Sequence, residues 1–456
     1  MNQKIAIITT STDVASENIE NELKSKLNLE EKTYNGLNNP YYLNDNFLLY
    51  ESNKKQLNLN NIDRVISKIF DVDLIVFPSR HSSEKRNQKT FSVHTPGNPG
   101  EEALYGGNKF SLSMSAPFAM KKALKSLERY SKELAPEFEV TLECTHHGPS
   151  EINIPCFFIE IGSSKKEWKN KDAGKVVAES IIDLKDLERE DSAAISLGGG
   201  HYSPRQTRLL FETETYLGHI IPDYQLENLD IIKKALEKTL NSKFIHLCRE
   251  KTKKEEFREK INKIDYPSYR EKHIRALDPI PFSLWKKIHE IEKDCTPFYF
   301  GKKQQEFSHE VIDKKFMDYV EKIDRKKLIE SIKEHELVHY RYQNGEISNN
   351  LLFPVEGLQK NKISFINSCI DIIKQKRNAY VSKGEKVFLI EIEEKRFNPG
   401  KAKKLGLTEK QFGELTSGQE IEIAGNTITP AMVHNIIKKK FEVNYLPINK
   451  KEVIRI

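Results

Sequence analysis

Apolar and polar residues over the first 265 positions follow the pattern of strands that alternate with helices. Lys4–Ile8 and Asp73–Phe77 are short apolar runs of the kind that form buried strands. After the first run, the polar residues 11–13 can cap a helix whose apolar positions recur from Val14 to Leu27. A strand that leads into a capped helix is typical of an α/β fold.

The same alternation continues downstream. Pro117 predicts the first turn of a long helix that ends near Leu134. Proline is favourable there because the N–H group that it lacks would have no hydrogen-bond partner in the first turn of a helix. Phe157–Ile161 and Ala193–Leu197 indicate further strands, and Asn35–Asn61 indicates an irregular excursion before a helix at 62–70. We therefore expect residues 1–265 to form a three-layer α/β/α sandwich with a mixed sheet.

The pattern changes after Asp265. The segment DYPSYREKHIRALDPIPF carries three prolines and mixed charge, which indicates a domain boundary. Beyond it, Phe307–Tyr342 reads as a charged helical stretch, while Val387–Ile392 and Glu420–Ile423 read as strands. Residues 266–456 are thus expected to form a C-terminal α+β domain.

Composition narrows the class of protein. The 456 residues are 38% hydrophobic and 31% charged, and no apolar run approaches the ~18 residues that span a bilayer. We expect a cytoplasmic monomer with no membrane segment. The 73 basic and 67 acidic residues make a mixed surface, which supports a polyanionic partner only weakly. Five cysteines without CxxC spacing argue against a disulfide framework, and Cys144 and Cys156 read as small buried side chains.

Histidines recur where predicted strands end. His81 follows Asp73–Phe77, His94 follows the strand-like Thr90–Val93, and His201 follows Ala193–Leu197. Ligands of open α/β sheets bind at the carboxyl ends of strands, so a shared site is expected there. A polar turn that merely contains histidines would explain any one of these positions, but not their repetition.

The densest chemistry lies at 143–147, where Glu143 and Thr145 precede the adjacent imidazoles of His146 and His147. Alternation from Phe138 to Thr145 predicts a half-buried strand with Glu143 on its polar face. Neutral imidazoles beside a carboxylate are suitable ligands for zinc.

These segments resemble the archaeal-type D-aminoacyl-tRNA deacylases. The matching motifs are SRHSS (79–83), FSVHTPGN (91–98), ECTHHGP (143–149), FIEIGSS (158–164), GGGHYSPRQT (198–207) and GHIIPDY (218–224). The resemblance runs to about Asp265, and Cys144 stands where the family pattern has alanine. It implies hydrolysis of the ester bond of D-aminoacyl-tRNA at the CCA end, dependence on Zn2+, and a phosphorylase or peptidyl-tRNA hydrolase-like sandwich.

We assign expected roles to these residues. The catalytic candidates are His146, His147, Glu143 and His201. The metal candidates are His81, His94, His146 and His147. The substrate-binding candidates are Gly198, Gly199, Gly200, Tyr202, Arg205 and Thr145. Glu160 lies inside an apolar run, so its charge needs a partner, which can be structural or can be a histidine that it orients.

Two alternatives stay open for the glycine-rich segment. Gly198–Gly200 before Ser203-Pro204 can bring the backbone and a helix N-terminus close to a phosphate, or it can be a plain connector. At the level of function, the alternatives are a peptidyl-tRNA hydrolase or another tRNA- or nucleotide-linked hydrolase, and a tRNA-binding protein without activity.

Two features of the C-terminal region complete the sequence picture. Residues 335–339 match HExxH, which on a helix can bind zinc, but a chance match in a chain rich in glutamate is a serious rival. Lys401–Val433 resembles a segment of tRNase Z-type enzymes without their metal-binding histidines.

Overall fold

The computed structural model describes residues 3–82, 88–248, 252, 254–304, 306–423, 425–446 and 453–455. Ser83 of the SRHSS motif lies outside them. The chain divides into two compact units, 1–275 and 276–456, whereas the sequence placed the boundary at 265. Each unit has its own sheets and its own apolar core.

An eight-stranded mixed sheet forms the centre of the first unit. Its order is β2-β3-β4-β1-β5-β10-β6-β9. The strands are β1 (Ile5–Thr10), β2 (Glu30–Lys32), β3 (Tyr41–Leu43), β4 (Phe47–Ser52), β5 (Leu74–Arg80), β6 (Thr90–His94), β9 (Glu139–Leu142) and β10 (Cys156–Gly162). Strands β4, β1, β5 and β10 are parallel, while β6 is antiparallel to β10 and β9 follows the direction of β6.

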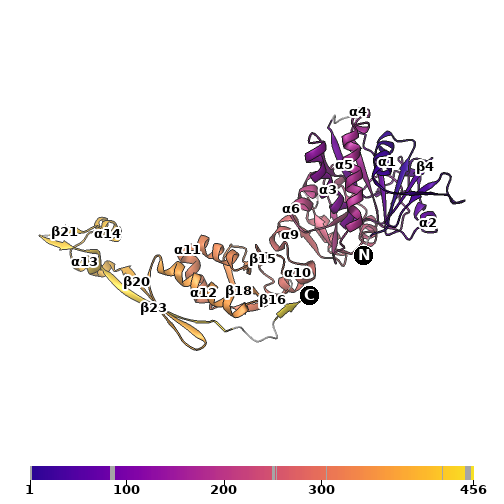
Figure 1. Cartoon of the computed structure of the whole chain (residues 1–456). Helices are drawn as coiled ribbons and strands as arrows, with labels where there is room; N and C mark the ends of the chain where they lie inside the picture. The colour runs from indigo at the N-terminus through magenta and orange to yellow at the C-terminus, as the bar shows by residue number, and fades with distance from the viewer. Residues whose placement is uncertain are drawn as a thin grey trace. The chain divides into compact units, whose positions relative to one another are not determined.

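Helices cover both faces of this sheet, as the α/β expectation requires. On one face, α1 (Val14–Lys26), α3 (Pro117–Leu134) and α5 (Lys171–Ile182) pack side by side (Figure 1). On the other face, α2 (Ile62–Ile66) contributes to a core with Ile8 and Phe77. The helix starts are as predicted: Asp13 accepts hydrogen bonds from the N–H groups of Ala15 and Ser16, and Pro117 is the first residue of α3.

Two local predictions were wrong. The segment 35–61 is not an irregular excursion, because it contains β3 and β4, which extend the sheet. Its apolar run Phe47–Tyr50 is buried between β1 and β3, and asparagines on either side form the turns. The helix expected at 62–70 ends at Ile66.

A second sheet holds the segment that carries His201. Four parallel strands have the order β12-β11-β13-β14. They are β11 (Ala193–Leu197), β12 (Leu217–Ile221), β13 (Ser242–Leu247) and β14 (Ser268–Arg270). The remaining helices and strands of the first unit include β7 (Gly97–Asn98), β8 (Ser111–Leu112), α4 (Lys165–Trp168), α6 (Pro204–Glu212), α7 (Leu229–Glu237), α8 (Glu255–Ile261) and α9 (Glu271–Leu277).

Backbone hydrogen bonds join the two sheets where the histidine-rich loop leaves β9. The N–H of Cys144 donates to the carbonyl of His201, and the N–H of Thr145 donates to that of Ile220, each at 2.8 Å. Residues 143–145 therefore pair with segments that follow β11 and belong to β12.

The second unit has the expected α+β composition. A five-stranded sheet has the order β15-β17-β18-β16-β24. The strands of this sheet and the helices of the same part of the chain are α10 (Phe282–Ile291), β15 (Thr296–Phe298), β16 (Glu306–Val311), α11 (Lys314–Glu334), β17 (Val338–Arg341), β18 (Ile347–Pro354), α12 (Leu358–Lys374) and β24 (Val453–Arg455). The continuous helical stretch predicted at 307–342 was wrong at both ends, because β16 and β17 flank α11.

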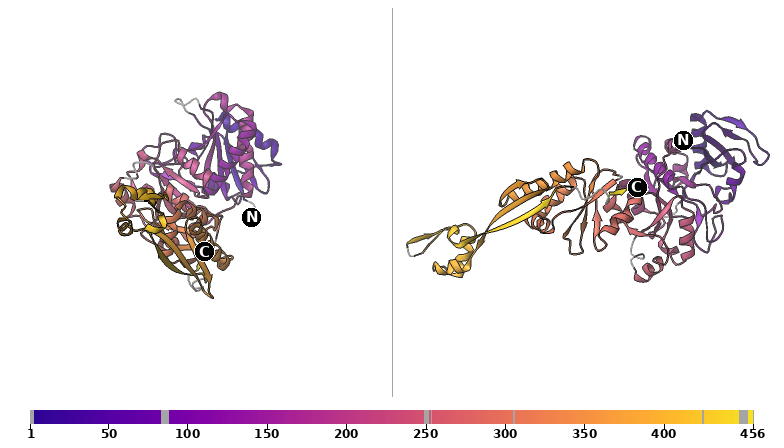
Figure 2. Two further views of the ribbon diagram at one scale, coloured as in Figure 1. Left: turned by 90° about the vertical axis from the view of Figure 1, so that its left-hand side faces the viewer. Right: turned by 90° about the horizontal axis from the view of Figure 1, so that it is seen from below.

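A long ribbon of strands leads from this core to a small module. The ribbon comprises β19 (Asn378–Lys383), β20 (Val387–Phe397) and β23 (His434–Asn444), and the module comprises α13 (Pro399–Lys404), α14 (Glu409–Thr416), β21 (Ile421–Ile423), β22 (Asn426–Ile428) and α15 (Pro430–Val433). Figures 1 and 2 show these elements beyond the paired ends of β20 and β23. The module has a core of its own around Leu407 and Leu415.

The HExxH match is not a metalloprotease helix. His335 caps the end of α11, Glu336 has a positive φ of 54°, and His339 lies in β17. The two imidazoles are therefore not one turn apart on a single helix, which is the geometry that the motif needs. Among the described residues, no helix is both long enough and apolar enough to cross a membrane.

The core of the second unit contains a buried ion pair that gives a stability test. Lys362 Nζ lies 2.6 Å from Glu310 Oε2, and neither side chain is exposed. Lys362→Met removes the ammonium group that neutralises the buried carboxylate of Glu310, so the free energy of unfolding should fall by about 3–5 kcal/mol. Urea denaturation measures the change. Lys326→Met, which removes an exposed partner of Glu330, should change it by less than about 1 kcal/mol; equal losses would contradict the prediction.

Candidate active site

Sheet order brings the predicted histidines together. His81 follows β5, Glu160 lies in β10, His94 ends β6, and Glu143 follows β9, so four neighbouring strands contribute. Because β6 and β9 run opposite to β5 and β10, their carboxyl ends do not share one edge. The expectation of a site at a single edge was therefore wrong. The side chains gather over the face of the sheet, where Ser79, Glu160 and Ser92 are in register.

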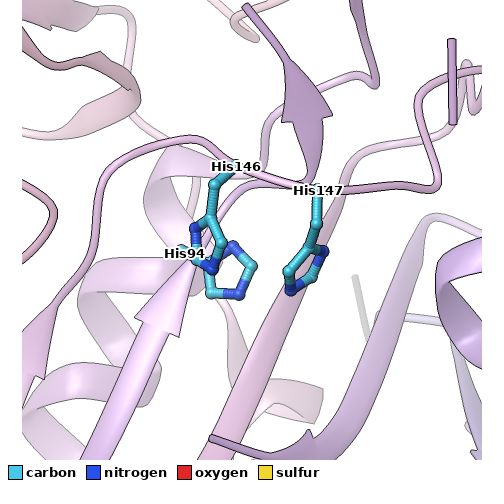
Figure 3. A group of neighbouring side chains, drawn as sticks. All are labelled: His94, His146 and His147. Carbon is cyan, nitrogen blue, oxygen red and sulfur yellow. The ribbon is translucent and has the colours of Figure 1, made fainter. Parts of the chain in front are cut away.

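Three imidazoles form the centre of the group. His146 and His147 project from one loop toward His94, and the rings lie close together (Figure 3). The ring centroid of His94 is 4.1 Å from that of His146 and 4.8 Å from that of His147. One ligand nitrogen from each ring falls within 4.8 Å of the others. This clustering of like side chains is unfavourable for charged rings and favourable for neutral ones.

Backbone carbonyls fix these rings in one tautomer. Nδ1 of His146 donates to the carbonyl of Cys144, and Nδ1 of His147 donates to that of Gly148, each at 2.8 Å. His94 Nδ1 lies 3.3 Å from the carbonyl of Thr95. A ring whose Nδ1 carries the proton presents the lone pair of Nε2, which is the form that ligates a metal ion.

Burial keeps the two adjacent imidazoles neutral. It lowers the pKa of His147 to about 4, and the neighbouring His94 acts in the same direction. Burial likewise lowers the pKa of His146 well below its usual value, with His94 and His147 adding to the effect. Near neutral pH both rings are therefore available as uncharged ligands or bases.

Two buried carboxylates lie next to the imidazoles. Glu160 Oε1 accepts a hydrogen bond of 2.6 Å from Ser79, and it is 3.7 Å from His94 Nε2. Glu143 lies 3.1 Å from His81 Nδ1 and 3.2 Å from His201 Nε2. Glu160 thus has the partner that its place in an apolar run requires, and that partner set includes histidines. Glu143 is not on a solvated polar face as expected, because the segment around His201 covers it and only 1% of it is exposed.

The carboxylates and two further histidines hold each other in their charged forms. Burial opposes the charge on His81, but Glu160 and Glu143 outweigh it and raise its pKa to about 10. Burial also opposes the charge on His201, whereas Cys144 and Glu143 raise its pKa to about 11. The pKa of Glu160 is correspondingly well below its usual value despite burial, through His81 and His94.

The donor set fits a zinc ion. Among the described residues, His94 Nε2 and both carboxylate oxygens of Glu143 are buried without a hydrogen-bond partner of good geometry. Buried polar atoms without partners are costly, and a metal ion or an ordered water would satisfy them. Three imidazoles that present ring nitrogens to one point match the ligand sets of catalytic zinc sites in proteins. His81, also expected as a ligand, lies outside this group and forms a second possible metal group with Glu143 and Glu160.

The residues expected to bind substrate do not all lie at the site. Tyr202 lies in the site, with its hydroxyl 2.8 Å from His81 Nε2. Thr145 is buried and contacts His219 Nδ1 at 3.0 Å. Arg205 is exposed on α6 and does not line the cavity described next.

The glycines of 198–200 make close backbone contacts within the chain. Gly198 has a φ of 103°, and a side chain there would collide with the carbonyl of Cys248. Gly199 has a φ of 100°, and its carbonyl accepts a hydrogen bond of 2.8 Å from the N–H of Asp223. The segment therefore needs glycine for its own turn, and these contacts alone do not indicate a phosphate.

A cavity of about 630 Å³ opens beside the histidines. One part of it is lined by His81, His146, His147, His201, Phe158 and Glu160. The rest is lined by residues that sequence reasoning missed, most of them in or near the ends of β1, β4 and β5. These are Thr10, Thr12, Asp13, Lys55, Gln56, Leu57, Ser79, Arg80, Ser82 and Tyr105. Thr10 and Thr12 lie at or just after the end of β1, so they fit the pattern of polar residues at strand ends that identified the histidines. Lys55 and Tyr105 belong to loops whose composition does not indicate a site.

Comparison with known proteins places this site in a family. The family model described as D-aminoacyl-tRNA deacylase matches residues 69–267. A D-aminoacyl-tRNA deacylase of Methanococcoides burtonii is 30% identical over 95% of both chains. This chain belongs to the D-aminoacyl-tRNA deacylase family. The Archaeoglobus fulgidus member is 40% identical and is matched over 79% of its length by 49% of this chain.

A solved structure supports the fold of the deacylase unit. The crystal structure of a conserved protein of unknown function is 32% identical, with a TM-score of 0.55, and covers 60% of this chain and 96% of its own. The family match at 69–267 lies within the first unit, which contains all the site residues above. The Methanococcoides relative extends the match into the second unit.

The raised pKa of His81 gives a pH test. A histidine near 6.5 when unfolded and near 10 when folded stabilises the protein fully below pH 6.5, and this contribution is lost as the pH rises toward 10. The difference in unfolding free energy between wild type and His81→Gln should therefore shrink from pH 6.5 to 10. Urea titrations with a chelator present measure it. His147→Gln is the control, because its lowered pKa produces a change only below pH 6.5; a difference for His81→Gln that stays constant to pH 10 would contradict the assignment.

Proposed function

We propose that this protein hydrolyses the ester bond of D-aminoacyl-tRNA and releases a free D-amino acid and tRNA. The supporting observation is the convergence of three imidazoles and a buried carboxylate beside one cavity, in a chain of this family. Ester hydrolysis needs an activated water, stabilisation of the negative charge on the carbonyl oxygen and a site for the leaving group. The residues around the cavity have the chemistry for each.

The proposed cofactor is Zn2+, held by His94, His146 and His147. When bound, zinc lowers the pKa of a water and polarises a carbonyl. Carbonyl groups of the protein already hold these rings with Nε2 available, which supports the choice. The alternative groups, Cys144 with His146 and His201, and His81 with Glu143 and Glu160, share residues with the acid–base apparatus described next.

Glu143 is the proposed general base. Its carboxylate is ionised, because His201 and His81 lower its pKa against the effect of burial, and its oxygens have no hydrogen-bond partner of good geometry. It can accept the proton of the attacking water. His201 lines the cavity as an imidazolium, so it can stabilise the developing oxyanion and donate a proton to the departing ribose oxygen. His81 lies 3.1 Å from Glu143, and Glu160 lies 3.7 Å from His94, so these two residues can position the base and the ligand.

The part of the cavity remote from the imidazoles is the proposed site for the terminal adenosine of the CCA end. Lys55 and Arg80 supply positive charge, and Thr10 and Thr12 supply hydroxyl groups. Tyr105 is 69% exposed at this cavity, which suits stacking against a base. A substrate of this kind implies work in the cytoplasm. The expectation of a monomer stays a prediction.

The substrate proposal is tested by deacylation assays. Matched D-tyrosyl-tRNA and L-tyrosyl-tRNA should be hydrolysed at very different rates, with the D form preferred, and a chelator should abolish turnover. N-acyl-aminoacyl-tRNA is the third substrate, since its hydrolysis would instead indicate a peptidyl-tRNA hydrolase. Affinity for tRNA without turnover of any of the three would indicate a binding protein.

The metal assignment has its own measurement, which does not depend on activity. His94→Ala and His147→Ala should each lower the zinc content of the purified protein by at least about 10-fold, because losing one of three ligands weakens binding strongly. Elemental analysis after dialysis gives the stoichiometry. His309→Ala, in the second unit, should leave it unchanged. Full zinc content in both site variants would remove these residues from the ligand set.

Glu143→Gln separates the acid–base role from metal binding. The amide keeps the size of the side chain but cannot accept a proton, so kcat should fall by about 100-fold or more. Zinc content should stay near the wild-type value, because Glu143 is outside the proposed ligand set. A variant with normal kcat, or one that loses zinc along with activity, would contradict the proposed role.

A further inference from the structure

A second cavity of the first unit is lined by basic residues. Its volume is about 330 Å³, and it lies among α8, β14 and the start of α9. The residues that line it are Leu247, Arg258, Ile261, Asn262, Ser268, Arg270, Lys272 and His273. Two arginines, a lysine and a histidine thus share one hollow, and no acidic side chain is found among the described residues of its lining. None of them belongs to the site described above.

The three permanent charges lack compensation within the part of the chain that the structure describes. No ion pair with an acidic side chain is found there for Arg258, Arg270 or Lys272, whereas Arg275 in the same segment contacts both Glu271 and Glu212. Glu271, the acid nearest in sequence to Arg270 and Lys272, is engaged by Arg275 and Arg208. Like charges around a hollow repel one another and favour a bound anion.

Strand register relates this cavity to the active site. Parallel pairing aligns Leu197 of β11, Leu247 of β13 and Arg270 of β14 in one row at the carboxyl ends of their strands. His201 follows Leu197 on the loop that leaves β11. Because neighbouring strands are ~4.8 Å apart, the rows of β11 and β14 are separated by only ~10 Å. The carboxyl edge of a parallel sheet is also where ligands commonly bind.

We propose that this basic cavity binds the phosphodiester backbone of the tRNA acceptor strand, close to its 3′ end. The inference rests on the proposed function for the identity of the RNA. Guanidinium groups recognise phosphate oxygens through paired hydrogen bonds, and Asn262 and Ser268 add neutral donors. A hollow larger than one phosphate group, on the edge that carries His201, suits a strand whose last nucleotide occupies the active site.

The test compares binding and turnover in charge-neutral variants. Arg258→Gln and Arg270→Gln should each weaken affinity for uncharged tRNA by about 3- to 10-fold at fixed salt, and should reduce the slope of log affinity against log salt by about one unit. KM for D-tyrosyl-tRNA should rise in parallel with kcat unchanged. Turnover of 3′-O-D-tyrosyl-adenosine, which has none of the phosphate groups of the tRNA, should not change.

Matched controls separate this role from a structural one. Lys260→Gln removes a charge from the same helix as Arg258 but outside the cavity, where Lys260 contacts Glu256, and it should leave tRNA affinity unchanged. Arg270→Lys keeps the charge and should restore most of the salt slope. Thermal unfolding midpoints show whether each variant is folded.

Two results would overturn the inference. Unchanged affinity for uncharged tRNA in both glutamine variants would do so, as would equal losses with the adenosine substrate. If inorganic phosphate binds the wild-type cavity while tRNA affinity is independent of Arg258 and Arg270, the cavity is a small-anion site and the inference is wrong. The two proposals can fail separately. If the protein does not deacylate D-tyrosyl-tRNA, the proposed function is wrong. The affinity for uncharged tRNA can still be measured in that case, because binding needs no catalysis, and it still decides whether the basic cavity binds tRNA.

Discussion

The first unit depends on how it accommodates two carboxylates on a buried sheet face. Glu143 and Glu160 are almost fully buried, and ionised groups in such surroundings require close positive partners. His81 and His201 meet this requirement and become charged, whereas burial keeps His146 and His147 neutral. One pair of imidazoles thus neutralises the acids, and another pair is kept uncharged. The two pairs differ because the first lies against the glutamates, while burial dominates for the second.

Much of this organisation could be predicted from the sequence. Apolar runs gave β1, β5, β6 and β11, and the capping residues gave the starts of α1 and α3, because these features depend on local chemistry. The misplaced segments share a cause: in 35–61 and 307–342, polar residues and charges hide short strands that pairing with neighbours stabilises. Tertiary context decides such segments, and a single sequence does not carry it.

The site was predictable as a set of residues but not as an arrangement. Histidines at strand ends identified its members, yet the reversal of β6 and β9 moved them from an edge onto a face. The separation of His81 from the other expected metal ligands follows from the same reversal, because Glu160 of β10 lies beside it. Lys55, Tyr105 and the basic cavity come from loops and strand register, which carry no motif.

The carbonyl groups that fix His94, His146 and His147 also bear on how the centre is assembled. Each ring is held through Nδ1 by the carbonyl of a residue one or two positions away in the sequence. Its rotation is therefore already restricted when the polypeptide has folded. The entropy of ordering the ligands is therefore lost during folding and not during ion uptake. The proposed zinc ion would therefore meet preformed ligands, and binding it would require no rearrangement of the backbone that holds these rings.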